Sequence, residues 1–282
     1  MRLFLNDWLR TLFIKCLCTL KVSYRILPVV MLPYALLRGA MSVKEWKQLL
    51  RYKDLVACAD NSLKFLVYFF LRRSTDLISG MMIVENPEKF LPNIQINGQE
   101  YVQKLKSNRH GVLVISNHGG PIMLQTFLFT QIMGIPLGSF TNRMSRWAKK
   151  RSILLEGEKV FKSLPCYRTG EEKSLLKGLL SGGWVNMLLD TPMAYENANC
   201  RLLNRDTALS LFPFRVSIKH SIPLLFVGIV QSFKDGTIKV SIEPVENFST
   251  STQGLEQYAE KLERLLREDP YGNSNVPRWI TR

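Results

Sequence analysis

A histidine lies within a glycine-rich turn, Asn117-His118-Gly119-Gly120-Pro121. A neutral imidazole in such a turn can take a proton from a hydroxyl group, which is the work of a general base. Backbone N–H groups at the start of a following helix disfavour the imidazolium and keep the ring neutral. Those N–H groups can also hold an oxyanion, and Gly119 and Gly120 allow a substrate carbonyl to approach the backbone closely. The turn predicts general-base and oxyanion chemistry; the structural alternative is a capping or hydrogen-bonded loop histidine.

The elements on either side of this turn are those that could position it. Residues 111–116 form a short, apolar, β-branched run, which is typical of a buried strand. Residues 122–133 form an apolar stretch of helical length, and Pro121 suits the first position of that helix. In open α/β sheets, ligands bind at the carboxyl ends of strands. The sequence therefore places His118 where a ligand would be expected.

The rest of the chain alternates between helical and strand patterns. Helices are predicted over residues 42–80, 98–107 and 171–181, and an amphipathic helix rich in leucine ends at Asp269-Pro270. Residues 184–189 read as a second buried strand, and residues 223–245 read as a β-hairpin that turns at Asp235-Gly236. We expect an α/β domain over residues 46–282, with a mixed, partly parallel sheet flanked by helices.

The first 45 residues mix apolar side chains with cations such as Arg2, Arg10 and Lys15. No apolar segment free of charge and followed by a cleavage site is visible, so we do not predict a secretory signal. The longest uncharged stretch, residues 26–37, is too short for a spanning helix, which needs about 20 residues. We expect residues 1–45 to form a basic, amphipathic, membrane-associated segment on the cytoplasmic face. An ordinary helical layer packed on the domain is the alternative.

The overall charge narrows the class of partner. The 282 residues carry a formal net charge of +15, which favours nucleic acid, anionic lipid or phosphorylated substrates. No finger spacing, RNP-like aromatic motif or heptad-backed basic region is present, so we do not expect nucleic-acid binding. Five scattered cysteines and three scattered histidines argue against a disulfide framework and a metal site. No P-loop or dinucleotide fingerprint is present, so no nucleotide cofactor is expected either.

A cluster of cations over residues 143–151, RMSRWAKKR, suits a phosphate-bearing ligand or an acidic carrier protein. Arginine can bind phosphate through two parallel hydrogen bonds, so Arg143 and Arg146 are candidate substrate-binding residues. A solvated basic helix face is the alternative. Cys166 and Cys200 have no histidine paired with them in the sequence and are expected to be inert. His220, which precedes a predicted strand, is expected to be structural.

The segment GVLVISNHGGPIM, residues 111–123, resembles the first motif of a known family. These are the late, or secondary, lipid A acyltransferases of the lysophospholipid acyltransferase superfamily. Their motif follows a strand and reads His, any residue, Gly, two residues, Glu. His118 and Gly120 match this pattern, but the acid should stand at Met123 and is missing.

Further features follow the order of that family over residues 10–280. They are the basic N-terminal segment, an arginine after the second strand-like run (Arg143), a strand that ends in an acid (Asp190), a proline that opens the next strand (Pro223), and the closing Pro277 and Trp279. The resemblance implies an acyltransferase-like α/β domain. It also implies that the donor is a thioester on the phosphopantetheine arm of a carrier protein, without metal or other cofactor.

In the family, the acid orients the histidine and stabilises the imidazolium, which Met123 cannot do. Asp190 is the favoured replacement, because it follows a strand expected to be parallel to the first one. Asp190 at a helix N-cap is the structural alternative. Three other acids, Glu156, Glu158 and Glu196, are less favoured as replacements.

Three functions remain open at this stage. The resemblance favours transfer of an aminoacyl group, glycine, to a hydroxyl of lipid A, because a branch similar to these acyltransferases does this. The adjacent ammonium makes such a thioester more electrophilic and less dependent on the missing acid. The alternatives are fatty acyl transfer in lipid A or phospholipid biosynthesis and a non-catalytic lipid-binding protein. All three place the chain at the cytoplasmic face of the inner membrane, and glycine transfer would reduce sensitivity to cationic antimicrobial peptides.

Overall fold

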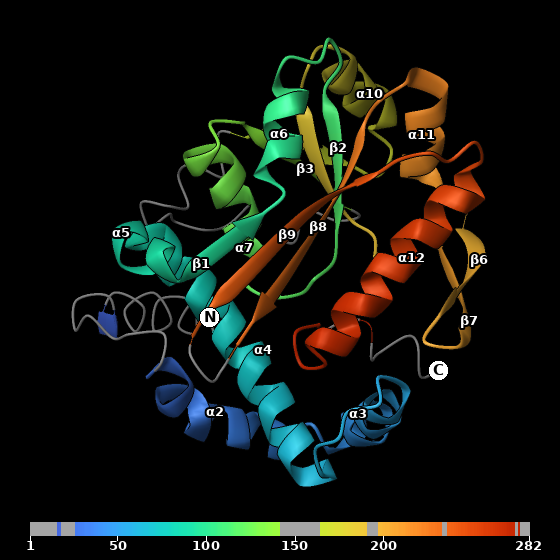
Figure 1. Ribbon diagram of the computed structural model, residues 1–282. Coiled ribbons are helices and arrows are strands. Elements are labelled where there is room, and N and C mark those ends of the chain that lie inside the picture. The colour runs from blue at the N-terminus through green and yellow to red at the C-terminus, as the bar shows by residue number, and fades with distance from the viewer. Residues whose placement is uncertain are drawn as a thin grey trace.

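A computed structural model describes residues 16–17, 26–141, 164–190, 197–232, 236–273 and 276. Within these residues the chain forms an α/β structure around a mixed, mostly parallel sheet of seven strands, in the order β1-β9-β8-β2-β5-β3-β4 (Figure 1). The strands are β1 (Ile94–Asn97), β2 (Val112–Ser116), β3 (Leu137–Thr141), β4 (Cys166–Arg168), β5 (Trp184–Leu188), β8 (Leu224–Gln231) and β9 (Ile238–Val245).

Strand direction follows from the pairing. Strands β8, β2, β5, β3 and β4 run parallel to one another, whereas β9 pairs with β8 in the antiparallel sense and β1 runs parallel to β9. The carboxyl ends of β2 and β5 therefore lie at the same edge of the sheet. The buried pattern of β2, in which all five residues are inaccessible, is that of a central parallel strand.

Helices surround the sheet. Those longer than one turn are α2 (Leu27–Met41), α3 (Val43–Leu55), α4 (Ser62–Glu85), α6 (Gln99–Lys106), α7 (Ile122–Phe127), α10 (Glu172–Leu180), α11 (Phe212–His220) and α12 (Ser251–Glu268), and the short turns are α5 (Pro87–Phe90), η1 (Leu91–Asn93) and the π-helical η2 (Leu128–Ile132). A separate antiparallel hairpin is formed by β6 (Asn197–Leu202) and β7 (Arg205–Ser210).

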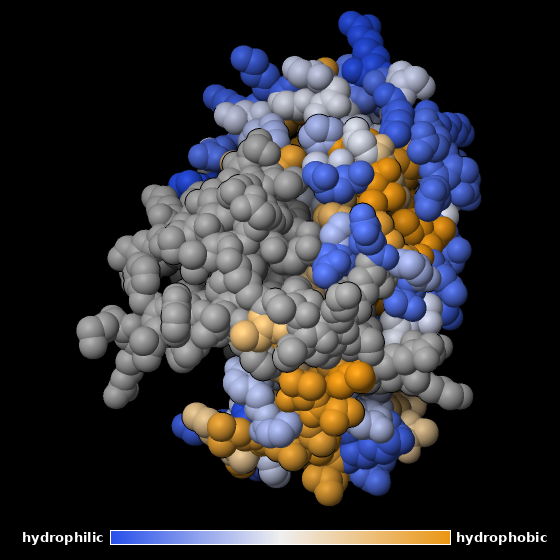
Figure 2. Space-filling view, turned by 90° about the vertical axis from the view of Figure 1, so that its left-hand side faces the viewer, coloured by the Kyte–Doolittle hydropathy of each residue, from blue (hydrophilic) through white to orange (hydrophobic). Residues whose placement is uncertain are grey.

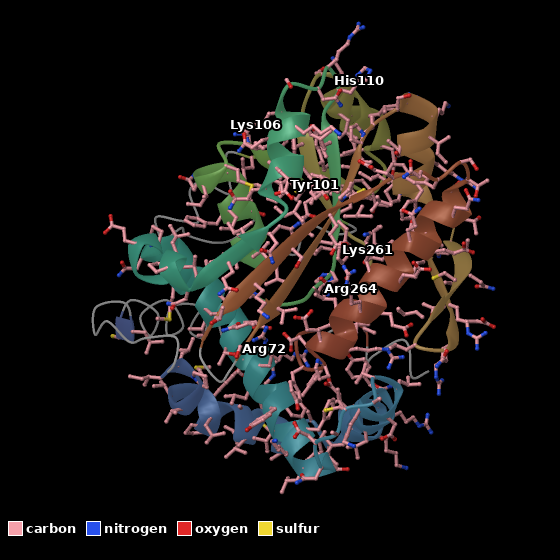
Figure 3. All side chains as sticks on the ribbon, in the orientation of Figure 1. Arg72, Tyr101, Lys106, His110, Lys261 and Arg264 are labelled. Carbon is pink, nitrogen blue, oxygen red and sulfur yellow. The ribbon has the colours of Figure 1, made fainter. Side chains whose placement is uncertain are left out.

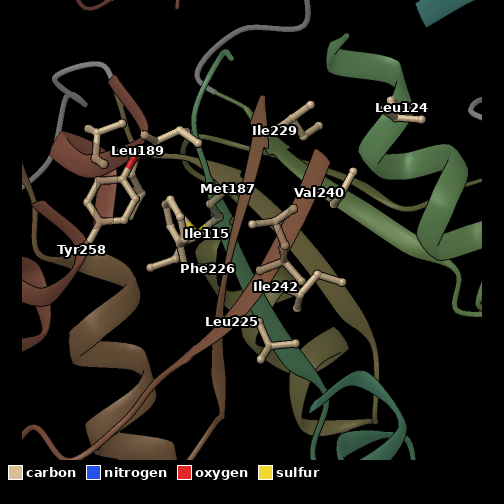
Figure 4. Packing of buried hydrophobic residues seen from close by; sticks show 14 of the residues in the cluster. Ile115, Leu124, Met187, Leu189, Leu225, Phe226, Ile229, Val240, Ile242 and Tyr258 are labelled. Carbon is tan, nitrogen blue, oxygen red and sulfur yellow. The ribbon is translucent and has the colours of Figure 1, made fainter. Parts of the chain in front are cut away.

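The core lies between the sheet and the long helices. Helix α12 packs on β8 and β9 and also contacts the hairpin strand β6, while α2 and α3 pack against α4. Figure 4 shows this packing around Tyr258, Leu189 and Phe226, where the hydroxyl end of Tyr258 points toward Leu189. The rings of Phe226 and Tyr258 meet edge to face at 5.8 Å, an arrangement that favours aromatic pairs beyond their buried area.

The sequence-based expectation of an α/β chain with a mixed, partly parallel sheet flanked by helices is confirmed. The predicted hairpin is also confirmed, as β8 and β9 pair from Leu224↔Val245 to Gln231↔Ile238. One detail differs: helix α7 begins at Ile122, so Pro121 takes the N-cap position before the first helical residue. The boundary expected between residues 45 and 46 stays a prediction, and both residues lie in α3.

The N-terminal helix α2 is apolar on two faces. Its inner face, with Leu27, Met31 and Ala35, belongs to the main hydrophobic cluster. Its outer face exposes Val29 at 69%, Leu37 at 61% and neighbouring apolar side chains. Across the described ranges, no helix has both the length and the apolar character that crossing a membrane requires.

Candidate active site

His118 and Asp190 come together because two neighbouring strands end in register. Ser116 at the end of β2 pairs with Leu188 at the end of β5. His118 and Asp190 each lie two residues beyond these positions, so the parallel register brings them side by side. From the sequence, this pair could be expected only because both strands were predicted to be parallel, and the register places it at the carboxyl edge of the sheet.

His118 contacts the Asp190 carboxylate through two short hydrogen bonds, one from its ring and one from its backbone. His118 Nδ1 lies 2.6 Å from Asp190 Oδ1, and the backbone N–H of His118 donates to Asp190 Oδ2 at 2.8 Å. A carboxylate can only accept, so Nδ1 carries the proton and Nε2 of the neutral ring keeps the free lone pair. Asp190 is fully buried, whereas the side chain of His118 is 23% exposed. Within the described chain Nε2 has no hydrogen-bond partner, which leaves this basic nitrogen for an incoming hydroxyl.

The segment after α12 completes the surroundings of Asp190. Asn273 is buried, and its Nδ2 donates to Asp190 Oδ2 at 2.6 Å. Gly119 and Asn273 form an isolated antiparallel bridge, in which the N–H of Gly120 donates to the carbonyl of Gly272 at 3.1 Å. The histidine turn and the C-terminal segment are therefore joined by both backbone and side-chain bonds.

The two glycines of the turn have different roles. Gly120 has φ +66°, and a Cβ there would lie 2.6 Å from Ile229 Cγ2, so both conformation and space require glycine. Its N–H is bonded to the carbonyl of Gly272, so this N–H is not a free donor, and the expected role of Gly120 in shaping an oxyanion site stays a prediction. The N–H of Gly119 is bonded to no described residue. A Cβ on Gly119 would lie 2.7 Å from Asn117 Nδ2, a buried amide nitrogen that also has no partner among the described residues.

A layer of polar contacts supports the end of β2. The hydroxyl of Tyr258 donates to the carbonyl of Ser116 at 3.1 Å, and the same carbonyl accepts the N–H of Leu189 at 2.9 Å. Burial, together with the nearby Asp190 carboxylate, raises the pKa of Tyr258 well above its ordinary value. Ser116 Oγ in turn donates to Asn186 Oδ1 at 2.9 Å. These contacts hold the strand end from which the His118 turn departs.

A buried ion pair fixes the C-terminal segment to helix α4. Arg72 is fully buried and donates to Asp269 Oδ2 at 2.8 Å and to the carbonyl of Gln231 at 3.0 Å. Figure 3 shows Arg72 on α4, at the other end of the sheet from His110, which precedes β2. Arg72 Nε also lies 3.0 Å from Asp76 Oδ1. Burial raises the pKa of Asp76 to about 7 despite the neighbouring Arg72, and the Asp269 carboxylate contributes to the rise.

The structure leaves several predicted residues without a description. Arg143, Arg146, Glu156, Glu158 and Glu196 lie outside the described residues. Met123 lies in the first turn of α7, where the structure describes only its backbone.

Cys200, Cys166 and His220, for which the sequence predicts no catalytic role, all lie in the described part of the chain. Cys200 is buried, and this burial raises the pKa of its thiol to about 11, which is the condition of an unreactive cysteine. Cys166 is exposed on β4. His220 is the last residue of α11, where a basic side chain suits the helix C-terminus.

Two further features bear on where chemistry takes place. Within the described part of the chain, no cluster of His, Cys, Asp and Glu residues could hold a metal ion. A pocket of about 480 Å³ is lined by Lys104, Ile218, Leu224 and Phe248, among others. Leu224 begins β8, which is parallel to β2, so this pocket lies at the opposite edge of the sheet from His118. The pocket is therefore not part of the His118–Asp190 site.

Sequence reasoning missed Asn273, Asn117 and Arg72. Asn117 belongs to the predicted turn, but no role was expected for its side chain. Asn273 and Arg72 belong to no local motif, and only the fold brings them to the elements they contact. The chain matches no family model, and no curated protein matches it.

Proposed function

We propose that this protein is a transferase that moves an acyl-type group from a thioester to a hydroxyl group, with His118 as the general base. The contact of 2.6 Å between His118 Nδ1 and Asp190 Oδ1 carries the proposal. A buried carboxylate on Nδ1 fixes the tautomer and stabilises the imidazolium that forms when Nε2 takes a proton. Asp190 thus supplies what Met123 cannot, from a neighbouring strand end instead of from the helix after the turn.

The proposed transfer takes place in two steps. Nε2 of His118 removes the proton of the acceptor hydroxyl as its oxygen attacks the thioester carbonyl carbon. The tetrahedral intermediate then collapses, the C–S bond breaks, and the leaving sulfur takes the proton back from the imidazolium. The products are an ester and a free thiol. Asp190 accepts from Nδ1 through both steps, and so holds the ring and stabilises the imidazolium.

The oxyanion of the intermediate requires hydrogen-bond donors aimed at the carbonyl oxygen. We assign this role to the N–H of Gly119 and the Nδ2 of Asn117, since neither donor is bonded within the described residues. Both are next to His118 in the same turn. Asn117 Nδ2 is buried beside Gly119, where a Cβ would come within 2.7 Å of it.

The donor and acceptor are assigned from the resemblance of residues 111–123 to the lipid A acyltransferases. The donor is an acyl or aminoacyl group carried on the phosphopantetheine arm of a carrier protein. The acceptor is a hydroxyl of lipid A or a related anionic glycolipid. Glycine is the preferred group, with fatty acyl transfer as the alternative. The net charge of +15 supports an acidic carrier and a phosphate-bearing acceptor, with Arg143 and Arg146 as candidate contacts.

The exposed apolar face of α2 supports action at the cytoplasmic face of a membrane. Figure 2 shows hydrophobic residues gathered at the foot of the molecule, where α2 lies. Val29, Leu36 and Leu37 are all at least half exposed there. The neighbouring helix α3 adds basic residues, including Lys44, that suit anionic headgroups. An acceptor lipid would then meet the protein at the bilayer surface.

The experiment is a mass spectrum of lipid A from cells in which the gene is intact, deleted, or replaced by His118→Ala. We expect deletion to remove the mass of one glycyl group, and His118→Ala to reproduce that loss. A matched control, His220→Ala, should keep the modification because His220 is at the end of α11. Loss of a fatty acyl mass would favour the fatty acyltransferase. Unchanged lipid A in all strains would contradict transfer to lipid A.

A further inference from the structure

The orientation of Asn273 is fixed by a bond on its other side. The N–H of Val276 donates to Asn273 Oδ1 at 2.9 Å, so Oδ1 is the acceptor and Nδ2 must face Asp190. Nδ2 then donates to Asp190 Oδ2 at 2.6 Å, while Oδ1 of the same carboxylate remains on His118 Nδ1. Asn273 therefore holds one carboxylate oxygen and directs the other toward the ring.

The segment that carries Asn273 is itself tied to the body of the protein. Asp269 at the end of α12 binds the buried Arg72 of α4 at 2.8 Å. The N–H of Gly272 then donates to the carbonyl of Asp269 at 3.1 Å, and the carbonyl of Gly272 accepts the N–H of Gly120. A Cβ on Gly272 would lie 2.5 Å from Asp269 Oδ2, so any larger residue there would displace the carboxylate that binds Arg72. Asn273 thus reaches Asp190 from a rigid support.

We propose that Asn273 is a positioning residue for the His118–Asp190 pair, which keeps Asp190 oriented toward Nδ1 and shares its negative charge. The catalytic part of this inference rests on the proposed function. Asn273 touches neither the ring nor Nε2, so it acts through Asp190. A hydrogen bond to a buried carboxylate disperses charge that would otherwise favour the imidazolium.

The charge effect can be measured without a substrate. Diethyl pyrocarbonate acylates neutral imidazole, and the rate at each histidine as a function of pH gives the midpoint of that histidine's titration. The chain has three histidines, so His110 and His220 serve as references in the same sample. Tyr258, a titratable residue that packs near Asp190, stays neutral over this range because burial raises its pKa. The measurement would run from about pH 5 to about pH 9, which brackets the usual histidine range.

The decisive variant is Asn273→Leu, which removes the hydrogen bond to Asp190 while keeping a side chain of similar size. The full charge of Asp190 then faces the ring and favours the imidazolium, so the midpoint of His118 should rise by about one pH unit. The midpoints of His110 and His220 should not move. Asn199→Leu is the matched control, because Asn199 is exposed on the hairpin strand β6 and its replacement should leave His118 unchanged.

A second variant tests orientation separately. Asn273→Ser removes the bond to Asp190 at small cost in shape, and we expect kcat to fall by about 100-fold with KM unchanged, as misplacement of a catalytic group does. It also provides the test if Asn273→Leu fails to fold. An unchanged His118 midpoint in folded Asn273→Leu, or an unchanged kcat in Asn273→Ser, would overturn the inference while the proposed function stands. A shifted midpoint in a protein whose wild type transfers no acyl group would support the Asn273 contact and overturn the proposed function.

Discussion

His118 binds the Asp190 carboxylate twice, through ring Nδ1 at 2.6 Å and through its own backbone N–H at 2.8 Å. One buried acid therefore fixes both the orientation of the imidazole and the path of the turn that carries it. This differs from a histidine oriented by an acid on the following helix, because here the acid comes from the end of a parallel strand. Changes that disturb the turn should consequently disturb the ring.

The space around Gly120 gives the first prediction. Gly120 and Gly134 have nearly the same φ, +66° and +67°, but only Gly120 has a neighbour, Ile229, where a Cβ would stand. Gly134→Ala should cost about 1–2 kcal/mol for the left-handed backbone alone. Gly120→Ala should cost at least about 1 kcal/mol more from overpacking, and Ile229→Ala in the same chain should recover part of it. Urea unfolding gives the free energy of unfolding of each variant. Equal decreases for Gly120→Ala and Gly134→Ala would refute the contact with Ile229.

The buried ion pair of Arg72 and Asp269 gives the second prediction, which concerns stability. Arg72→Met leaves Asp269 and Asp76 without their buried cation, and removing one partner of such a pair costs about 3–5 kcal/mol. Arg267→Met is the matched control, since it breaks a pair with Glu263 on α12 whose side chains are 38% and 29% exposed. An exposed pair contributes about 1 kcal/mol or less. Similar losses of unfolding free energy in both variants would argue against the anchoring role of Arg72.

Asp76 predicts a dependence of stability on pH. Its pKa is raised from 3.8 to about 7 in the folded chain, first by burial, so the folded state keeps a proton that the unfolded state releases. The stability from this proton is fully present below about pH 4 and is lost as the pH rises through about 7. The loss approaches about 1.4 kcal/mol per pH unit inside that window. The contribution of this proton is measured as the difference in unfolding free energy between wild type and Asp76→Asn at each pH. If this difference stays constant between about pH 4 and about pH 7, the raised pKa of Asp76 is contradicted.

The outer face of α2 predicts membrane binding. Val29→Glu and Leu37→Glu each place a charge where an apolar side chain would enter the lipid. Because burying such a side chain contributes about 1.5–3 kcal/mol, affinity for vesicles containing an anionic phospholipid should fall about tenfold or more for each change. Ile218→Glu on α11 is a control at an exposed apolar position elsewhere. If flotation assays show equal binding for all three variants, α2 is not the membrane-binding face.

Local sequence was sufficient to predict the histidine turn. A β-branched run, two glycines and a proline specify strand, turn and helix within a dozen residues, and the actual elements differ by one residue at Pro121. The place of Asp190 could also be predicted, because a buried strand that ends in an acid puts that acid at the carboxyl edge of the sheet. The register that sets it opposite His118 could not be known without the pairing of β2 and β5.

Other parts of the site depend on contacts between distant segments. Arg72 and Asn273 lie near opposite ends of the chain, and each reaches its partner only after the sheet and helices have packed. The hairpin β6–β7 was missed because its turn, Leu203-Asn204, takes positive φ without a glycine to signal it. The bond from the Gly120 N–H to the carbonyl of Gly272 could not be predicted either, because Gly272 is remote in the sequence.

The central claim is that His118 and Asp190 act as one unit, and a double-mutant cycle on the purified protein tests it most directly. The readout is transfer from an aminoacyl carrier-protein thioester to lipid A, at substrate concentrations well below KM. His118→Ala and Asp190→Asn should each lower kcat/KM by about 10⁴, and the double variant should be no worse than either single one. Losses that add in free energy, or an Asp190→Asn variant as active as the wild type, would contradict the pair as the catalytic unit.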